Sequence, residues 1–164
     1  MSRPPSPARE IRLLLLDVDG VLTDGGLYYF AAQGLALRFH VRDGFGLRRA
    51  VAAGLIVGVI SGRDSAQVRR RVEELGLQEI HLGVRDKQAV VEEILARRNL
   101  PASAACFIGD DVVDLPAMAA VGFPVAVADA ENEVRQAAQL VTRRSGGHGA
   151  VREVIDLLLG SRTS

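Results

Sequence analysis

The stretch Leu13–Gly26 reads LLLLDVDGVLTDGG, and it decides both the fold and the place where polar groups gather. A run of four leucines is typical of a short strand that is buried on both faces. The run ends at Asp17, and Asp19 and Asp24 follow within eight positions. Because an ionised carboxylate strongly resists burial without a partner, an apolar strand that ends in acids needs something to compensate their charge.

The composition favours one compact domain with a small partner. The chain has 164 residues, 48% of them hydrophobic, which is enough for a single core. Lys plus Arg and Asp plus Glu both number 20, so we expect no nucleic acid and no membrane as a partner. The single cysteine, Cys106, lies in an apolar run, which favours a buried structural thiol over a disulfide or a thiol metal cluster. We expect a disordered tail over residues 1–10, a single domain over residues 11–164, and a cytoplasmic protein without a signal peptide or transmembrane helix.

Strands and helices alternate along the rest of the chain. The expected strands are Ile11–Leu16, Leu55–Ile60, Glu79–Leu82, Ala104–Ile108 and Pro124–Val127. The expected helices are Phe45–Ala53, Ser65–Leu75, Lys87–Arg98, Asp114–Val121, Ala130–Ala138 and Ala150–Leu159. This alternation predicts an α/β fold with a doubly wound parallel sheet. Only Leu27–Val41 departs from it, and two β-prone stretches around Gln33 and Gly34 predict an inserted β-hairpin there.

Polar residues follow the expected strands at the edge where open α/β sheets bind ligands. They are Asp17 and Asp19 after the first strand, Ser61 after the second, Asp86 and Lys87 after the third, and Asp110, Asp111 and Asp114 after the fourth. Two close carboxylates repel unless a cation or a shared proton intervenes. If a helix begins at GDDVVD, Asp110 and Asp114 are also like charges on one helix face. A hard divalent cation would bind both groups of acids, and oxygen ligands favour magnesium over zinc.

Each of these residues also has an ordinary structural explanation. An Asp or Ser between a strand and a helix is often an N-cap, because it satisfies free N–H groups of the helix. Lys87 by itself could be a solvated lysine at a helix start. These explanations do not account for the joint pattern at successive strand ends, so we interpret the pattern as a functional site.

The motifs resemble those of the haloacid dehalogenase superfamily of phosphatases, which have a Rossmann-like fold. They are DVDGVLTD at 17–24, ISGR at 60–63, Lys87, and GDDVVD at 109–114. The resemblance implies that Asp17 is a nucleophile that forms an aspartyl-phosphate, and that Asp19 is the general acid and base. A response-regulator receiver domain also combines acids, a Ser or Thr and a Lys around magnesium. There the acidic pair comes early and the phosphorylated Asp follows the third strand, unlike the order in this chain.

The same resemblance implies a Mg²⁺ cofactor. Its ligands would be the Asp17 carboxylate, the Asp19 backbone carbonyl and the Asp110 carboxylate, and it would cancel charge where an anion attacks a phosphate dianion. Lys87 and the Ser61 hydroxyl would hold phosphoryl oxygens. Around them, Asp111 and Asp114 would orient metal-bound waters and Lys87.

Many superfamily members close the site with a cap domain, and this chain has no room for one. Only Asp24–Arg42 separates the first motif from the next helix, and Arg63–Lys87 holds one helix and one strand. An uncapped site needs a large substrate or walls from a neighbouring subunit. We therefore expect a homo-oligomer, formed through the apolar hairpin residues Leu27, Tyr28, Tyr29, Phe30, Leu35, Leu37 and Phe39.

Over residues 11–159 the chain resembles the 3-deoxy-D-manno-octulosonate 8-phosphate (Kdo 8-phosphate) phosphatases. The similar segments include DVDGVLTDGGLYY, FHVRDGFG, VISGRDSAQVRRRVEELG, IGDDVVDLPAM and GGHGAVREV. The resemblance implies an uncapped homotetramer that releases inorganic phosphate and Kdo in lipopolysaccharide precursor synthesis. Two alternatives stay open: a phosphatase for nine-carbon, sialic-acid-type sugar 9-phosphates, and a non-catalytic phosphatase-like binding module.

Arginine suits the carboxylate of a sugar acid because its guanidinium donates two parallel hydrogen bonds. Arg63 is the first candidate for this substrate contact, followed by Arg71 and Arg42, although each also fits a solvated helix surface. Gly146–Gly149 (GGHG) is expected to be a flexible flap that could fold over the site. We expect His148 within it to be exposed rather than catalytic.

Overall fold

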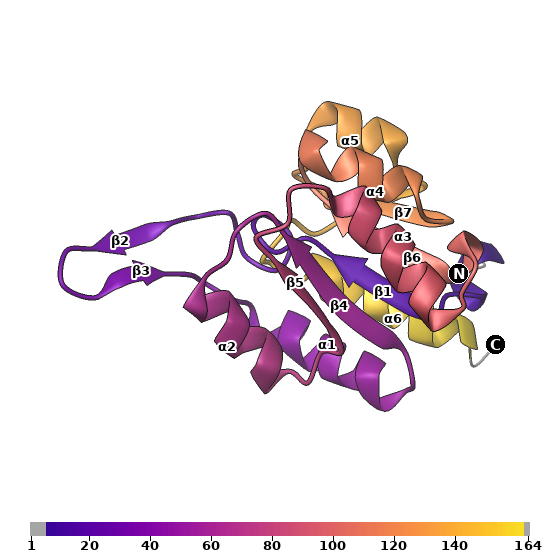
Figure 1. Cartoon of the computed structure of the whole chain (residues 1–164), viewed down its shortest axis with the longest axis horizontal. Coiled ribbons are helices and arrows are strands. Elements are labelled where there is room, and N and C mark those ends of the chain that lie inside the picture. Colours follow the sequence, from indigo (N-terminus) through magenta and orange to yellow (C-terminus); the bar gives the residue numbers. More distant parts are fainter. Residues whose placement is uncertain (1–5, 163–164) are drawn as a thin grey trace.

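A six-stranded parallel sheet forms the centre of the molecule (Figure 1). The computed structural model describes residues 6–162. The strands are β1 (Leu13–Leu16), β4 (Ile56–Ser61), β5 (Glu79–Leu82), β6 (Ala105–Gly109), β7 (Phe123–Ala126) and β8 (Leu140–Val141), in the order β5-β4-β1-β6-β7-β8. The predicted doubly wound α/β fold is confirmed. Strand β8 was missed because two residues carry no periodicity.

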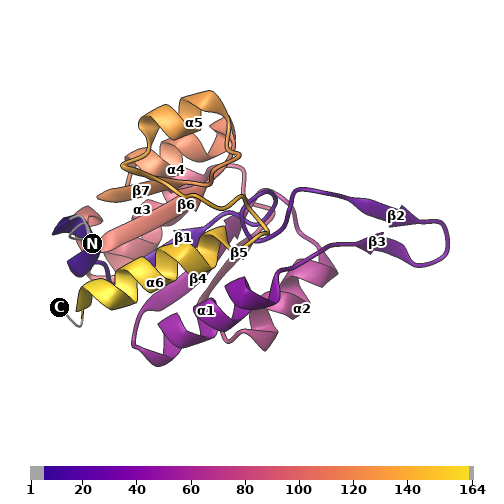
Figure 2. The same ribbon diagram turned by 180° about the vertical axis from the view of Figure 1, so that it is seen from behind.

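Helices cover both faces of this sheet. They are α1 (Val41–Ala52), α2 (Ala66–Glu74), α3 (Lys87–Arg98), α4 (Leu115–Ala119), α5 (Asn132–Ala137) and α6 (Ala150–Arg162). Helices α1 and α6 pack together on one face, and α3 and α4 pack together on the other (Figures 1 and 2). Helix α1 begins four residues before the predicted Phe45, because the His40 side chain accepts a hydrogen bond from the Arg42 N–H and caps the helix.

Strand β1 is the central strand of this arrangement. It pairs with β4 on one side and with β6 on the other, and each of its four leucines is 0% exposed. Burying a leucine contributes roughly 1.5–3 kcal/mol, so this strand is held firmly in place. The strand order reverses here: the chain first adds β4 and β5 on one side of β1, and then adds β6, β7 and β8 on the other side. Asp17, directly after β1, therefore lies at the topological switch point where open α/β sheets bind ligands.

The predicted β-hairpin is confirmed. Strands β2 (Tyr28–Phe30) and β3 (Gly34–Ala36) pair antiparallel and extend away from the body of the molecule (Figure 1). The turn between them uses Gly34 at φ 77°, a conformation that favours glycine. Tyr29 is 72% exposed and Phe30 is 52% exposed. The hairpin thus presents apolar side chains to the surroundings of a single chain.

The structure describes only part of the tail predicted over residues 1–10, so its disorder stays a prediction. Residues 1–5 lie outside the described residues, but Ser6–Arg9 forms the 3-10 helix η1, which packs against α6. Ala8 in this helix is 0% exposed, so this part of the segment makes a buried contact. Within residues 6–162, no helix is both long enough and apolar enough to cross a membrane.

Candidate active site

The carboxyl ends of β1, β4 and β6 bring most of the predicted site residues to one cavity of about 620 Å³. Its lining includes Asp17, Asp19, Arg63, Lys87, Asp110 and Asp111. Ser61 and Asp114 are buried beside this lining, at 1% and 0% exposure. The strand-end pattern in the sequence therefore identified groups that share one place in the fold.

Lys87 lies between two buried carboxylates. It is the first residue of α3 and only 6% exposed, and its ammonium Nζ is 3.0 Å from Asp17 Oδ1 and 2.7 Å from Asp114 Oδ1. Asp17 Oδ1 also accepts a hydrogen bond of 2.7 Å from the Val18 N–H. Asp114 is fully buried and connects Lys87 to the GDDVVD segment at 109–114. Lys87 is thus an ion-pair partner and not a solvated lysine at a helix start.

The acids around Lys87 carry more negative charge than one lysine balances. Burial, followed by the charge of Asp114, raises the pKa of Asp17 to about 7 even though Lys87 acts in the opposite direction. Burial, followed by the charges of Asp17 and Asp114, raises the pKa of Asp110 to about 8. Burial opposes the charged form of Lys87, but its two carboxylate partners outweigh that effect and raise its pKa. The cluster therefore needs a further positive charge if Asp17 and Asp110 are to be ionised together.

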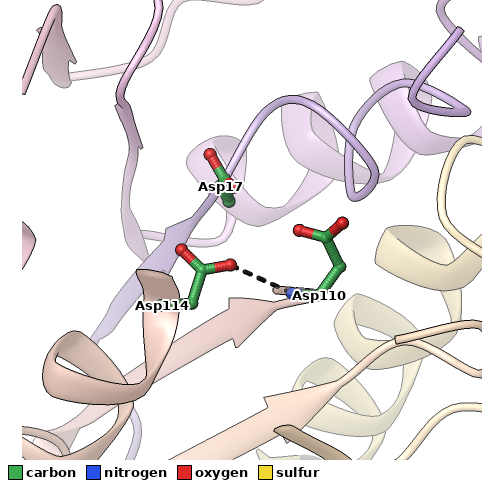
Figure 3. A group of neighbouring side chains, drawn as sticks. All are labelled: Asp17, Asp110 and Asp114. Carbon is green, nitrogen blue, oxygen red and sulfur yellow. Dashed lines mark hydrogen bonds between the residues drawn. The ribbon is translucent and has the colours of Figure 1, made fainter. Parts of the chain in front are cut away.

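The acids also have the arrangement of a metal site. Asp17, Asp110 and Asp114 each place a carboxylate oxygen within 4.8 Å of the other two (Figure 3). Both carboxylate oxygens of Asp114 already have partners. Its Oδ1 accepts from Lys87, and its Oδ2 accepts a 3.0 Å hydrogen bond from the Asp110 N–H. Asp110 Oδ1 is buried and has no hydrogen-bond partner among residues 6–162. Asp17 and Asp110 therefore fit a hard cation such as Mg²⁺ as carboxylate ligands, with Asp114 holding the groups around them.

Gly20 keeps this site open. Its φ is 81°, and a Cβ atom at this position would collide with the Asp110 carboxylate. Only glycine therefore lets the loop after Asp19 approach Asp110 so closely.

Asp19 and Arg63 form an ion pair at the cavity. Asp19 Oδ2 is 3.1 Å from Arg63 Nε, while Asp19 Oδ1 is buried and has no partner within the described residues. The Arg63 N–H donates to Ser61 Oγ at 3.2 Å, so the Ser61 hydroxyl hydrogen can point elsewhere. The loop after β4 thus places the Arg63 cation beside Asp19, and the Ser61 hydroxyl lies at the end of β4 itself.

Two of the three predicted arginines lie outside this cavity. Arg42 is exposed in the first turn of α1. Arg71 lines a separate cavity of about 490 Å³ with Phe39, and its guanidinium carbon is 5.9 Å from the centroid of that ring. Arg71 also pairs with Glu74 at 3.5 Å. Residue type suggested these arginines, but neither of them lines the cavity that holds Asp17.

The GDDVVD segment differs in detail from the expectation. Asp114 ends the 3-10 helix η3 (Val112–Asp114), and α4 begins only at Leu115. Asp110 and Asp114 therefore do not lie on one helix face. Their carboxylates still repel each other, but Asp114 Oδ2 accepts a hydrogen bond from the Asp110 backbone N–H. Asp111 is exposed and caps η3 by accepting the Val112 N–H at 2.6 Å, which is its ordinary structural explanation.

The predicted glycine flap does not fold over the cavity. Gly146 and Gly147 are buried, and the Gly147 N–H donates to the Val21 carbonyl at 2.9 Å, so the segment packs against the loop that follows Asp19. His148 is exposed, as predicted.

Arg85 also lines the cavity, and the sequence did not lead us to predict it. It follows the end of β5, so the rule that ligands bind at the carboxyl ends of strands could have found it.

Comparisons with known proteins agree with the geometry. A family model described as haloacid dehalogenase-like hydrolase matches residues 78–155. The 3-deoxy-D-manno-octulosonate 8-phosphate phosphatase of Haemophilus influenzae is 44% identical over 149 residues, which cover 91% of this chain and 83% of that protein. The corresponding phosphatase of Escherichia coli K12 is 44% identical over 153 residues, covering 93% of this chain and 81% of that protein.

A solved structure shares the fold over nearly the whole chain. The phosphatase of the same name from Moraxella catarrhalis, in complex with magnesium, phosphate and KDO, has a TM-score of 0.93 and 36% identity, and the match covers 96% of this chain and 90% of that one. These similarities exclude the receiver-domain alternative. The chain belongs to the 3-deoxy-D-manno-octulosonate 8-phosphate phosphatase family of haloacid dehalogenase-like hydrolases.

Proposed function

We propose that this chain is a Mg²⁺-dependent phosphomonoesterase that hydrolyses 3-deoxy-D-manno-octulosonate 8-phosphate to Kdo and inorganic phosphate. The observation that carries the proposal is the convergence of Asp17, Lys87 and Asp110 in one cavity, in a chain 44% identical to phosphatases of that name. The match to the Moraxella catarrhalis protein, whose structure holds magnesium, phosphate and KDO, supports the same substrate and cofactor.

The metal would be held by the Asp17 carboxylate, the Asp19 backbone carbonyl and the Asp110 carboxylate. When bound, Mg²⁺ would supply the missing positive charge and allow an anionic carboxylate to approach a phosphate dianion. The unpartnered Asp110 Oδ1 and the raised pKa values of Asp17 and Asp110 support this assignment, because both acids need a cation to ionise together.

Asp17 would act as the nucleophile. Its Oδ1 accepts from the Val18 N–H and faces Lys87, which fixes the rotamer of the carboxylate. One carboxylate oxygen would attack phosphorus, and the bond from phosphorus to the sugar oxygen would break as an aspartyl-phosphate forms. Lys87 Nζ and the Ser61 hydroxyl would donate to the phosphoryl oxygens as negative charge develops there.

Asp19 would move the protons. It would give its proton to the leaving sugar oxygen in the first step, and would then take a proton from the water that attacks the aspartyl-phosphate. This second step returns the Asp17 carboxylate and releases phosphate. The Arg63 guanidinium, 3.1 Å from Asp19 Oδ2, lies at the cavity and is the arginine we propose for the sugar-acid carboxylate.

We also propose that the chain works as a homotetramer. The exposed aromatic side chains of the hairpin need a partner surface, and the open cavity has no cap. Arg42 and Arg71 lie outside their own cavity, so in such an assembly they would contact substrate only from a neighbouring copy. The predicted cytoplasmic location stays a prediction.

The test is phosphate release by the purified chain with Mg²⁺ and a panel of sugar-acid phosphates. We expect rapid release from Kdo 8-phosphate and at least a 1,000-fold loss in Asp17→Asn, with little change in Asp156→Asn, whose carboxylate lies on the surface of α6. Failure to release phosphate from any member would refute the enzyme and favour a binding module. Faster release from a nine-carbon 9-phosphate would replace the substrate and keep the chemistry.

A further inference from the structure

Asp43 is a buried carboxylate that the proposed chemistry does not use. It lies in the first turn of α1, is 0% exposed, and accepts the Arg152 N–H at 2.8 Å through Oδ1 and the Gly149 N–H at 3.2 Å through Oδ2. The first N–H groups of a helix have no partner within that helix, so an acid from elsewhere can cap them. Asp43 therefore caps α6 from α1, which lies beside it (Figure 2).

The cap fixes the segment that immediately precedes α6. Gly149 ends the Gly146–Gly149 loop, and its φ of 102° requires glycine. At the other end of the loop, the Gly146 N–H donates to Asp129 Oδ1 at 2.9 Å. The loop is thus held at both ends by carboxylates from distant parts of the sequence.

This loop in turn supports the backbone that follows Asp19. The Gly147 N–H donates to the Val21 carbonyl at 2.9 Å. A Cβ atom at Gly146 would collide with the Gly20 carbonyl, and one at Gly147 would collide with the Asp24 backbone nitrogen. The two segments are therefore in direct backbone contact, and a shift of the loop would displace the segment from Gly20 to Asp24.

The supported segment determines where Asp19 points. Residues 18–22 belong to no helix or strand, and the Val18 carbonyl accepts the N–H groups of Val21 and Leu22 in a tight turn. Asp19 precedes Gly20, whose left-handed φ of 81° sets the direction of the chain at this point. The Asp19 carboxylate has one buried oxygen without a partner in the described part of the chain. The other oxygen, Oδ2, is held by Arg63 at 3.1 Å, so the position of the carboxylate depends on this one side chain and on the backbone.

We propose that Asp43 is a positioning residue for the phosphatase reaction: it fixes the Gly146–Gly149 loop, and that loop holds the backbone that aims Asp19. The proposal rests on the proposed function, in which Asp19 donates and accepts the protons. Asp43 itself touches neither the substrate nor the reacting atoms. A 1 Å displacement of a catalytic group is enough to cost about 100-fold in rate, so a weakened support has a measurable effect.

Two variants and one matched control test the proposal. Asp43→Ala removes the cap, and Asp129→Ala removes the second tether from an exposed position where a folding defect is not expected. Asp156→Ala is the control, because Asp156 also connects α6 to α1 through Arg49 and pairs with Arg152 of its own helix, but makes no hydrogen bond or ion pair with the loop among the described residues. Asp43→Asn, which keeps one acceptor oxygen, should restore part of the activity that Asp43→Ala loses.

The kinetic readout separates Asp19 from Asp17. With Kdo 8-phosphate we expect kcat to fall about 10- to 100-fold in Asp43→Ala, and less in Asp129→Ala, with KM changed less than about threefold. With p-nitrophenyl phosphate the leaving group needs no proton, so the burst of nitrophenolate should stay near one per chain in both variants. A burst that falls in proportion to kcat would show mere loss of folded protein and would overturn the proposal.

Amide hydrogen exchange provides a readout that does not depend on activity. We expect exchange in residues 20–24 to accelerate at least about fivefold in Asp43→Ala and Asp129→Ala and to stay unchanged in Asp156→Ala. Unchanged exchange at residues 20–24 in both variants would overturn the proposed support, whatever the enzyme does. If exchange at residues 20–24 accelerates in the two variants but the wild-type chain releases no phosphate, the support of the loop stands and the proposed function is refuted.

Discussion

Replacing Glu79 by glutamine is expected to destabilise the fold while leaving the chemistry intact. Glu79 begins β5, is 2% exposed, and binds the two guanidinium groups that end α3, with Arg97 Nη2 at 2.8 Å from Oε2 and Arg98 Nη2 at 2.7 Å from Oε1. Lys87 lies at the opposite end of this helix, about 15 Å away at 1.5 Å per residue. Glu79 therefore ties α3 to the edge strand far from the cavity.

The size of the effect follows from the pKa of Glu79. Burial raises this pKa, but hydrogen bonds from Arg97, His81 and Arg98 outweigh burial and lower it from 4.5 to about 2. A difference of about 2.5 pKa units corresponds to about 3.4 kcal/mol of stability at neutral pH. The arginine side chains are 47% and 33% exposed, so water screens the pairs and we expect about half of that value, roughly 1.5–2 kcal/mol.

The pH dependence has a definite sign. Because the pKa of Glu79 is lower in the folded chain than in the unfolded chain, the ionised carboxylate stabilises the fold above about pH 4.5. This stabilisation is lost as the pH falls through about 2. At pH 3 the unfolded chain already binds the proton, so the gap between wild type and Glu79→Gln should narrow by about 1 kcal/mol relative to pH 7.

Urea unfolding followed by far-UV circular dichroism measures both quantities, since the chain has no tryptophan to report by fluorescence. Glu92→Gln is the control, because Glu92 is exposed on the same helix and, among residues 6–162, accepts only from the neutral Gln88 amide. We expect it to stay within about 0.5 kcal/mol of wild type. Three results would refute this reasoning. They are equal stability of Glu79→Gln and wild type at pH 7, a difference in unfolding free energy that does not change with pH, and a lower kcat in Glu79→Gln.

Three further outcomes follow from the site and the core. Lys87→Met should lower kcat for phosphate release about 100- to 1,000-fold, because it removes the cation between Asp17 and Asp114; a loss under tenfold in steady-state assays would contradict its role. Chelation by EDTA should abolish phosphate release and added Mg²⁺ should restore it, with a higher Mg²⁺ requirement in Asp110→Asn; activity that persists in EDTA would exclude the assigned metal. Burial raises the pKa of the Cys106 thiol, so iodoacetamide should label it only in urea, and labelling of the native chain in mass spectra would contradict this.

The predictable part of the molecule was local in sequence or followed from parallel topology. The leucines before Asp17 identify a buried strand by themselves, and the rule that strand ends share one edge then brings Lys87 and Asp110 to the same place. The roles of Arg42 and Arg71 could not be assigned in this way, because residue type alone does not say which way a helix faces. Asp43 was missed for another reason: its partner Gly149 lies 106 positions away, and no periodicity connects the two.

Several residues of the site have local conformations or environments that are unfavourable by themselves. A lysine at the first position of a helix opposes the helix dipole by roughly 0.3–1 kcal/mol, yet Lys87 stands there. Buried carboxylates cost more still, and two of them, Asp17 and Asp114, flank it. Gly20 takes a left-handed φ where any side chain would strike Asp110. Each of these residues destabilises the helix, strand or loop that carries it. Together they form a centre that a cation and a phosphate would complete. Locally unfavourable residues therefore mark the place of the proposed function.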